Sequence, residues 1–140
     1  CSAREVRFVE SEYAVPRHAV EPVLRELRAW FERTREPVPF PVEVRFVGAD
    51  DAWLSTAYER DNAYVAVHQY HRMDPRPLFA AFESIVAEHE GRPHWGKVHT
   101  LGARRLAGLY PRFEDFRAVR DRLDPGRLFT NDHVRHLLGD

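Results

Sequence analysis

Glu43 and Arg45 lie two residues apart in segment 42–47, whose alternation of apolar and polar residues predicts a half-buried strand. Side chains two positions apart on a strand point the same way, so the carboxylate and the guanidinium face one space, roughly 6–7 Å apart at the backbone. Such a pair can bind a hydroxylated substrate. The carboxylate accepts or removes the hydroxyl proton, and the guanidinium stabilises the developing negative oxygen. The alternative is an exposed ion pair on an ordinary amphipathic strand.

A second candidate is the loop at residues 92–99, which combines His94, Trp95, Gly96 and Lys97, the only lysine of the chain. Loops carry binding and catalytic residues more often than cores do. Gly96 lets the backbone approach a planar ligand closely, and Lys97 places a compact positive charge near an anionic or electron-rich group. The alternative is a surface loop with Trp95 in the core and Lys97 in water.

His68 and Tyr70 share one face of another expected strand, and we expect them to line the same cavity with hydrogen-bonding groups. The alternative is a pair of satisfied interior polar residues. No metal site is expected, because neither residues 68–71 nor residues 94–99 have an established zinc spacing. The sequence also contains no nucleophile elbow and no glycine-rich phosphate loop.

The elements that position these residues follow from residue type and periodicity. A run rich in valine and aromatic residues predicts the first strand, and apolar residues at helical spacing, with Pro22 in the first turn, predict the helix after it. Asp74 is expected to cap a later helix and Gly91 to end it. In chain order we expect a strand at 4–13, a helix at about 20–31, strands at 42–47 and 63–71, a helix at 74–91, an irregular loop at 91–102, and short helices at about 113–123 and 131–138.

This order predicts an α+β fold, in which helices cover one face of an antiparallel or mixed sheet. The 140 residues, 44% of them hydrophobic, suit a single core, and a formal charge of −1 argues against a nucleic-acid partner. No apolar segment is long enough to predict a membrane span. The single cysteine, Cys1, fits a reducing compartment, so we expect a cytoplasmic location.

Four ordered motifs resemble one enzyme family. They are Pro-Val-Glu-Val-Arg at 41–45, Ala-Trp-Leu-Ser at 52–55, Arg-Pro-His-Trp-Gly-Lys at 92–97, and Asp-Pro to Phe-x-Asn at 124–131. They are similar to motifs of the sugar-1,4-lactone oxidases, which include gulonolactone, galactonolactone and arabinonolactone oxidases or dehydrogenases and alditol oxidases. These enzymes belong to the vanillyl-alcohol oxidase class of flavoproteins.

The resemblance implies that residues 1–140 are the C-terminal substrate, or cap, portion of a two-domain flavoenzyme. The N-terminal FAD-binding domain is then absent from this chain, which begins at Cys1 and not at methionine. The cofactor implied is FAD, and the implied protein partner is that domain, in the same protein or as a companion chain.

The resemblance also implies roles for individual residues. Glu43 and Arg45 match the pair that contacts the reacting hydroxyl, and Lys97 matches the lysine beside the flavin ring and the substrate. Cofactor contacts are implied for the neighbouring loop and for the closing segment: His94, Trp95, Gly96, Asn131 and His133.

The expected function is therefore the oxidation of a sugar-1,4-lactone, L-gulono-1,4-lactone or a close relative, by hydride transfer to flavin. His68 and Tyr70 are expected to contact the substrate, and they favour a ring-shaped lactone over an open polyol. Two alternatives stay open. One is part of an alditol (polyol) oxidase, and the other is a non-catalytic carbohydrate-binding or interaction module.

Overall fold

The computed structural model describes residues 6–139, and its centre is a four-stranded antiparallel sheet in the order β2-β3-β1-β4. The long strands β1 (Phe8–Pro16) and β3 (Asn62–Tyr70) pair along their whole length. The outer strands, β2 (Glu43–Val47) and β4 (Arg92–Pro93), pair with β3 and β1 respectively. The α+β prediction is confirmed, and the sheet is antiparallel.

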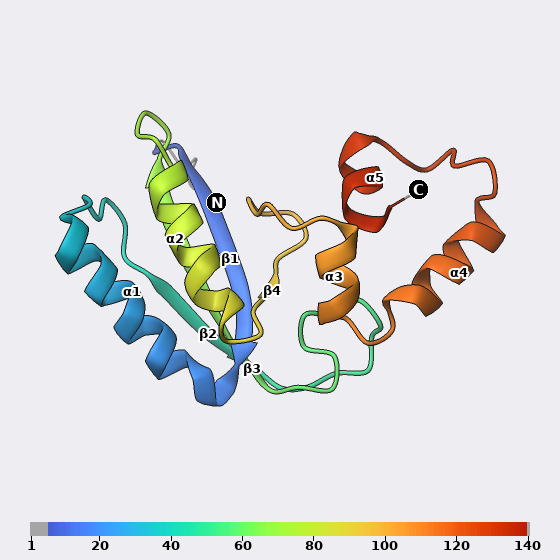
Figure 1. The fold of residues 1–140 in the computed structure, drawn as a ribbon, viewed down its shortest axis with the longest axis horizontal. Coiled ribbons are helices and arrows are strands. Elements are labelled where there is room, and N and C mark those ends of the chain that lie inside the picture. The colour runs from blue at the N-terminus through green and yellow to red at the C-terminus, as the bar shows by residue number, and fades with distance from the viewer. Residues whose placement is uncertain (1–5, 140) are drawn as a thin grey trace.

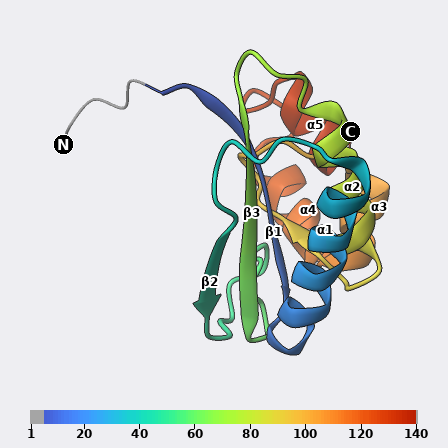
Figure 2. The same cartoon turned by 90° about the vertical axis from the view of Figure 1, so that its left-hand side faces the viewer.

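Two helices cover one face of this sheet (Figure 2). They are α1 (Val20–Thr34), which follows a single 3-10 turn at Arg17–Ala19, and α2 (Arg76–Ala87). Alternate strand residues point at these helices and are buried with them: Tyr13, Val15, Val65 and Val67 from the strands, and Val23, Leu27, Leu78 and Phe82 from the helices. Because side chains alternate along a strand, the intervening residues lie on the opposite face, which α1 and α2 leave open.

The ends of these elements have local causes. Arg35, with φ of 56°, adopts the left-handed conformation that ends α1 before the prolines. At the start of α2, Asp74 accepts a hydrogen bond from the Arg76 backbone N–H, although the N-cap position itself is occupied by Pro75. Gly91 approaches the helix so closely that a Cβ there would lie 2.8 Å from the Val86 carbonyl oxygen, so a side chain at this position requires a backbone shift.

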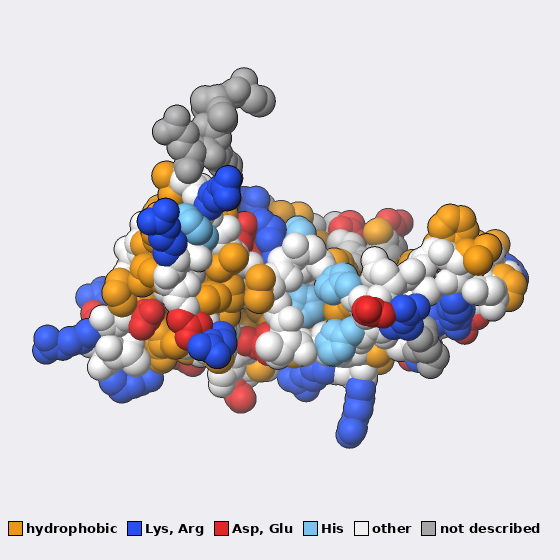
Figure 3. Space-filling view, turned by 90° about the horizontal axis from the view of Figure 1, so that it is seen from above, with side chains coloured by type: hydrophobic (Ala, Val, Ile, Leu, Met, Phe, Trp, Pro, Cys, Tyr) orange, Lys and Arg blue, Asp and Glu red, His pale blue; other side chains and the backbone are white. Residues whose placement is uncertain are grey.

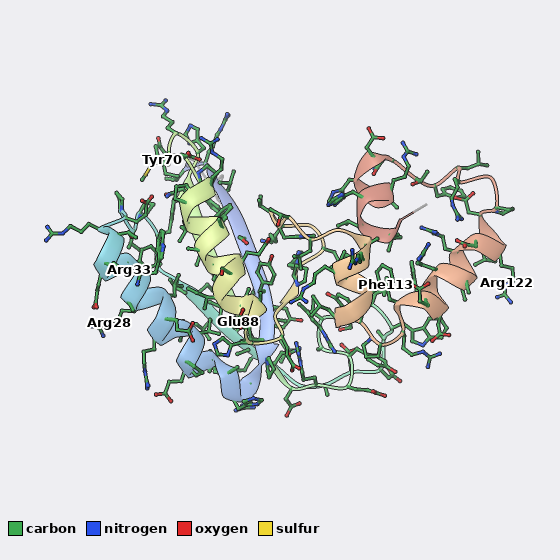
Figure 4. The ribbon with its side chains drawn as sticks, viewed as in Figure 1. Arg28, Arg33, Tyr70, Glu88, Phe113 and Arg122 are labelled. Atoms are coloured by element: carbon green, nitrogen blue, oxygen red, sulfur yellow. The ribbon has the colours of Figure 1, made fainter. Side chains whose placement is uncertain are left out.

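Three shorter helices form the other half of the molecule (Figure 1). They are α3 (Ala103–Leu109), α4 (Phe113–Leu123) and α5 (Asp132–Leu138), and they bury a second core of Leu106, Tyr110, Phe113 and Leu137. Phe113 lies at the start of α4, where that helix meets α3 (Figure 4).

Three expectations need correction. The first strand was expected at 4–13; Arg4 and Glu5 lie outside the described residues, and the strand continues to Pro16 because its end pairs with Asn62. The short strand β4 falls inside the expected irregular loop, since residues 92–93 pair with Tyr13 and Ala14. The sequence pattern also does not predict α3, whose seven residues include only two large apolar side chains, Leu106 and Leu109.

Candidate functional site

The open face of the sheet carries a cluster of charged side chains drawn from three strands and one loop. We call it the charged cluster: Glu10, Glu12, Glu43, Arg45, His68 and Lys97. The strand register brings the members together, because Glu10 is paired with His68, and Glu12 and Glu43 are both paired with Ala66 from opposite sides of β3. Residues that are far apart in sequence therefore share one surface.

Arg45 is held between two carboxylates. Its Nη2 lies 2.7 Å from Glu12 Oε1, and its Nε lies 3.3 Å from Glu43 Oε1. The Glu12 side chain is only 2% exposed, whereas Arg45 and Glu43 are about half exposed, at 52% and 47%. A buried carboxylate thus anchors the guanidinium from beneath, and the Glu43–Arg45 pair remains open to a ligand.

Lys97 joins the cluster because its loop is fixed to β1. The backbone N–H groups of His94 and Val98 donate to the carbonyl oxygens of Glu12 and Glu10, at 2.9 and 3.0 Å. Lys97 Nζ donates to Glu10 Oε2 and lies 3.9 Å from Glu12 Oε2. The structure therefore brings Glu43, Arg45 and Lys97 to one place, as their expected joint role requires.

The electrostatics keep Glu10 ionised. Burial by itself raises the pKa of Glu10, but the hydrogen bond and charge of Lys97, together with the charge of His68, outweigh burial. The pKa of this carboxyl is therefore lowered below its usual 4.5. The neighbouring Glu12 Oε2 atom is buried and accepts no hydrogen bond.

A cleft of about 450 Å³ opens beside Arg45. Trp95 forms one wall: its Nε1 donates to the Leu54 carbonyl at 2.8 Å, and its ring lies 4.9 Å from the Tyr110 ring. The lining mixes charged, hydroxyl and aromatic groups: Glu12, Arg45, Val47, Leu54, Ser55, Thr56, Tyr64, His94 and Trp95. Convergent polar groups on an aromatic wall are typical of sites for polar small molecules.

The remaining loop and strand residues occupy different positions. The Gly96 N–H donates to His94 Nδ1 at 3.1 Å, so these two residues form a compact turn, of which His94 lines the cleft. His68 lies 3.5 Å from Glu10 and lines a second hollow, of about 420 Å³, with Glu43. Tyr70 is not brought into the charged cluster, because it lies at the far end of β3 and its ring contacts His71 (Figure 4).

Asn131 and His133 lie at the start of α5, in the helical half of the molecule, whereas the charged cluster lies on β1, β2, β3 and the loop after β4 (Figure 1). Asn131 Oδ1 accepts a hydrogen bond from the Val134 N–H at 2.9 Å, so this side chain caps α5. His133 is exposed at the start of the helix. Histidine side chains gather on the upper surface between the two halves (Figure 3).

His99 is partly buried, and both of its ring nitrogens are buried without a hydrogen-bond partner. Burial lowers the pKa of His99; Glu83 opposes this effect, and His133, His136 and His94 add to it. Within residues 6–139, no three His, Cys, Asp or Glu side chains are arranged to hold a metal ion. None of the described helices is long and apolar enough to cross a membrane.

Sequence reasoning missed Glu10 and Glu12. Their spacing within the expected first strand was a usable signal, because two acidic residues two positions apart share a face just as Glu43 and Arg45 do. The local sequence pattern does not show which strand pairs with the strand that carries Glu10 and Glu12. Only the register of β1 against β3 places these carboxylates beside Arg45 and Lys97.

Comparison with known proteins identifies the family of this chain. The model of the D-arabinono-1,4-lactone oxidase family matches residues 1–137, so the chain belongs to that family. The resemblance to sugar-1,4-lactone oxidases is thereby confirmed.

Curated relatives agree with the family. The chain is 49% identical to an L-gulono-1,4-lactone dehydrogenase of Mycobacterium tuberculosis, over 97% of this chain and 32% of the relative. It is 35% identical to the L-gulonolactone oxidase of Bos taurus, over 95% of this chain and 32% of the relative. It is 39% identical to an alditol oxidase of a Streptomyces species, over 93% of this chain and 31% of the relative. The chain thus spans about a third of the length of these relatives.

Proposed function

We propose that this chain is the C-terminal, substrate-binding part of an FAD-dependent oxidoreductase that oxidises a sugar-1,4-lactone, L-gulono-1,4-lactone or a close relative. It acts together with an FAD-binding domain, in the same polypeptide or in a companion chain. One observation carries the proposal: Glu43, Arg45 and Lys97, from two separate segments, meet on the open face of the sheet. The names of the relatives support the lactone as the substrate class.

The chain's own residues bind and orient the lactone in this proposal. A lactone hydroxyl donates to Glu43, and the Arg45 charge stabilises the oxygen as its proton is lost. Glu12 holds the guanidinium in place from beneath. Trp95 supplies an apolar wall for the ring face, and polar side chains across the cleft bind further hydroxyls.

The loop whose His94 and Trp95 line the cleft fits a flavin. Lys97 is 29% exposed, so its ammonium is accessible next to the exposed Gly96. A Cβ at Gly96 would meet only the His94 ring, no nearer than 3.6 Å, so a planar group can approach this backbone from outside. A compact ammonium suits the negative charge that a flavin ring gains when reduced. Bound FAD supplies the acceptor for the hydride lost from the carbinol carbon.

Lys97, His94, Trp95 and Gly96 are the residues that we propose to hold the flavin ring. Asn131 and His133 are proposed as further contacts, from the start of α5. Asn131 uses its Oδ1 as a cap, which leaves its amide N–H groups for a cofactor.

A polyol is the second candidate substrate, because the alditol oxidase relative is 39% identical over 93% of this chain. The experiment uses the flavin-bound protein that contains this chain, mixed anaerobically with L-gulono-1,4-lactone or with a sugar alcohol. We expect the lactone to bleach the visible flavin band much faster. Faster bleaching by the sugar alcohol would favour the polyol oxidase. No bleaching by either compound would favour a non-catalytic carbohydrate-binding or interaction module.

A further inference from the structure

Lys97 lies between two carboxylates that it does not contact equally. Its Nζ donates a hydrogen bond to Glu10 Oε2, whereas Glu12 Oε2 lies 3.9 Å away. Glu12 Oε2 accepts no hydrogen bond although it is buried. The ammonium therefore has one close partner and a second, unsatisfied carboxylate oxygen within short reach.

Glu10 is itself fixed on several sides. Its carbonyl oxygen accepts from the Val98 N–H at 3.0 Å, which keeps the backbone beside Lys97 against β1. Its other carboxylate oxygen, Oε1, lies 3.5 Å from His68 Nε2, and its side chain is only 15% exposed. A partly buried ion pair is screened less by water and salt than a surface pair.

The neighbouring Glu12 is already used by another cation, since its Oε1 is paired with Arg45 at 2.7 Å. Lys97 and Arg45 therefore stand on either side of one buried carboxylate. If Lys97 moved fully onto Glu12, both cations would share that group, and Lys97 would leave Glu10.

We propose that Glu10 is a positioning residue that holds the Lys97 ammonium beside the cleft. Glu12 Oε2 is the alternative ion-pair partner of this ammonium, and it binds the ammonium more weakly. The role of Lys97 toward flavin and lactone rests on the proposed function, but the seating of the lysine does not. Glu10 acts through Lys97 and contacts neither lactone nor flavin in this proposal.

The first test exploits Lys97 being the only lysine of this chain. In protein in which only this chain carries isotope-labelled lysine, by segmental labelling where the FAD-binding domain is in the same polypeptide, NMR reports one side-chain Cε with its two Hε protons. We expect two inequivalent Hε protons in the wild type, because a held side chain lies in an asymmetric environment. Glu10→Gln should shift the signal but keep the inequivalence, as the ammonium moves to Glu12. Glu12→Gln should leave it in place, and the double variant should give a signal averaged as in a free lysine.

Glu26→Gln is the matched control, because Glu26 forms a carboxylate–histidine pair with His89, at 2.9 Å, away from the charged cluster. It should not change the lysine signal. An unchanged signal in Glu10→Gln, or an equal shift in Glu12→Gln, would overturn the proposal. Glu10→Gln and Glu26→Gln both preserve side-chain shape, and Glu10→Ala, which also removes the carboxylate, gives the same test if the glutamine variant does not fold.

The second test uses the flavin-bound protein with L-gulono-1,4-lactone. Glu10→Gln should slow flavin reduction about tenfold in the wild-type background and have no further effect in a Lys97→Ala background, because residues acting as a unit are non-additive. A further loss in that background would show that Glu10 acts independently of Lys97, and would overturn the proposal. If lactone reduces no flavin in the wild type, the proposed function fails, while the NMR result still decides where Lys97 is seated.

Discussion

At the scale of single residues, Arg45 is the group whose chemistry the structure defines most closely. Its guanidinium contacts two carboxylates through two different nitrogens. Nη2 lies 2.7 Å from the buried Glu12 carboxylate, and Nε lies 3.3 Å from the exposed Glu43 carboxylate. A planar fork has this reach, and a point-like ammonium does not.

Arg45→Lys is therefore expected to weaken lactone binding. The ammonium can satisfy Glu12 or orient Glu43, but not both, so the KM for L-gulono-1,4-lactone should rise about tenfold, equivalent to about 1.4 kcal/mol. Steady-state kinetics of the flavin-bound protein measure this. Arg33→Lys on the exposed side of α1 is the matched control and should leave KM unchanged (Figure 4). A KM for Arg45→Lys equal to that of the control would remove Arg45 from the substrate site.

The sequence predicted some residues of the charged cluster and missed others. Alternation along residues 42–47 was enough to put Glu43 and Arg45 on one face, because that relation is local. Lys97 was a candidate as the only lysine, in a loop with His94, Trp95 and Gly96, and the family resemblance gave it a role beside the flavin. The buried Glu12 beneath them depends on the pairing of β1 with β3, which is a long-range property that no local pattern encodes.

At the scale of elements, a carboxylate on α2 ties that helix to the sheet and to the loop before α3. Glu83 accepts hydrogen bonds from the Tyr13 hydroxyl and from the Thr100 backbone N–H. Burial raises the pKa of Glu83, but the hydrogen bonds from Thr100 and Tyr13 outweigh burial and lower it below 4.5. The unfolded chain then binds this proton more readily than the folded chain does.

Glu83 therefore contributes stability that is present above pH 4.5 and is lost as the pH falls through its lowered pKa. In Glu83→Gln, the free energy of unfolding should be lower at pH 7 and should fall less steeply below pH 4.5 than in the wild type. Urea unfolding at a series of pH values measures both. Parallel pH profiles for the two proteins would contradict this account.

Asn131 gives a second element-scale prediction, because it caps α5 through its Oδ1. Asn131→Ala should destabilise the chain by about 1 kcal/mol, whereas Asn131→Ser, which keeps a capping oxygen, should lose less. Thermal unfolding measures this effect. Equal stability of the alanine and serine variants would show that the cap contributes nothing.

The sequence predicted the helices with a strong apolar periodicity and missed the one without it. The helix at α1 has a continuous apolar stripe and a proline in its first turn, and the sequence indicated it well. By contrast, α3 has seven residues and no side-chain cap, so its stability comes from packing in the second core, which only the folded chain forms.

At the scale of the whole molecule, Arg92 connects the two halves. It is 6% exposed, and it donates to the carbonyl oxygens of Tyr58 and Leu109 at 2.9 and 3.0 Å. It also contributes, with burial, to lowering the pKa of Arg60 to about 10. The guanidinium thus joins the loop between β2 and β3 to the end of α3.

Arg92→Met should therefore cost about 3 kcal/mol of stability, because the side-chain volume stays similar while the carbonyl groups of Thr56, Tyr58 and Leu109 lose this donor. Arg122→Met, at an exposed position near the end of α4, is the matched control and should cost little (Figure 4). Denaturant unfolding compares the two variants. A loss for Arg92→Met no larger than that for the control would show that the two halves do not depend on this residue.

The molecule as a whole presents one open, charged face of a sheet whose other face is covered by helices (Figure 2). The measurement that tests its proposed role most directly is the anaerobic rate of flavin reduction by L-gulono-1,4-lactone, in the flavin-bound protein that contains this chain. Glu43→Gln and Lys97→Ala should each slow this rate by about a hundredfold or more, since each removes a group that acts on the reacting hydroxyl or beside the flavin. Wild-type rates in both variants would contradict the account.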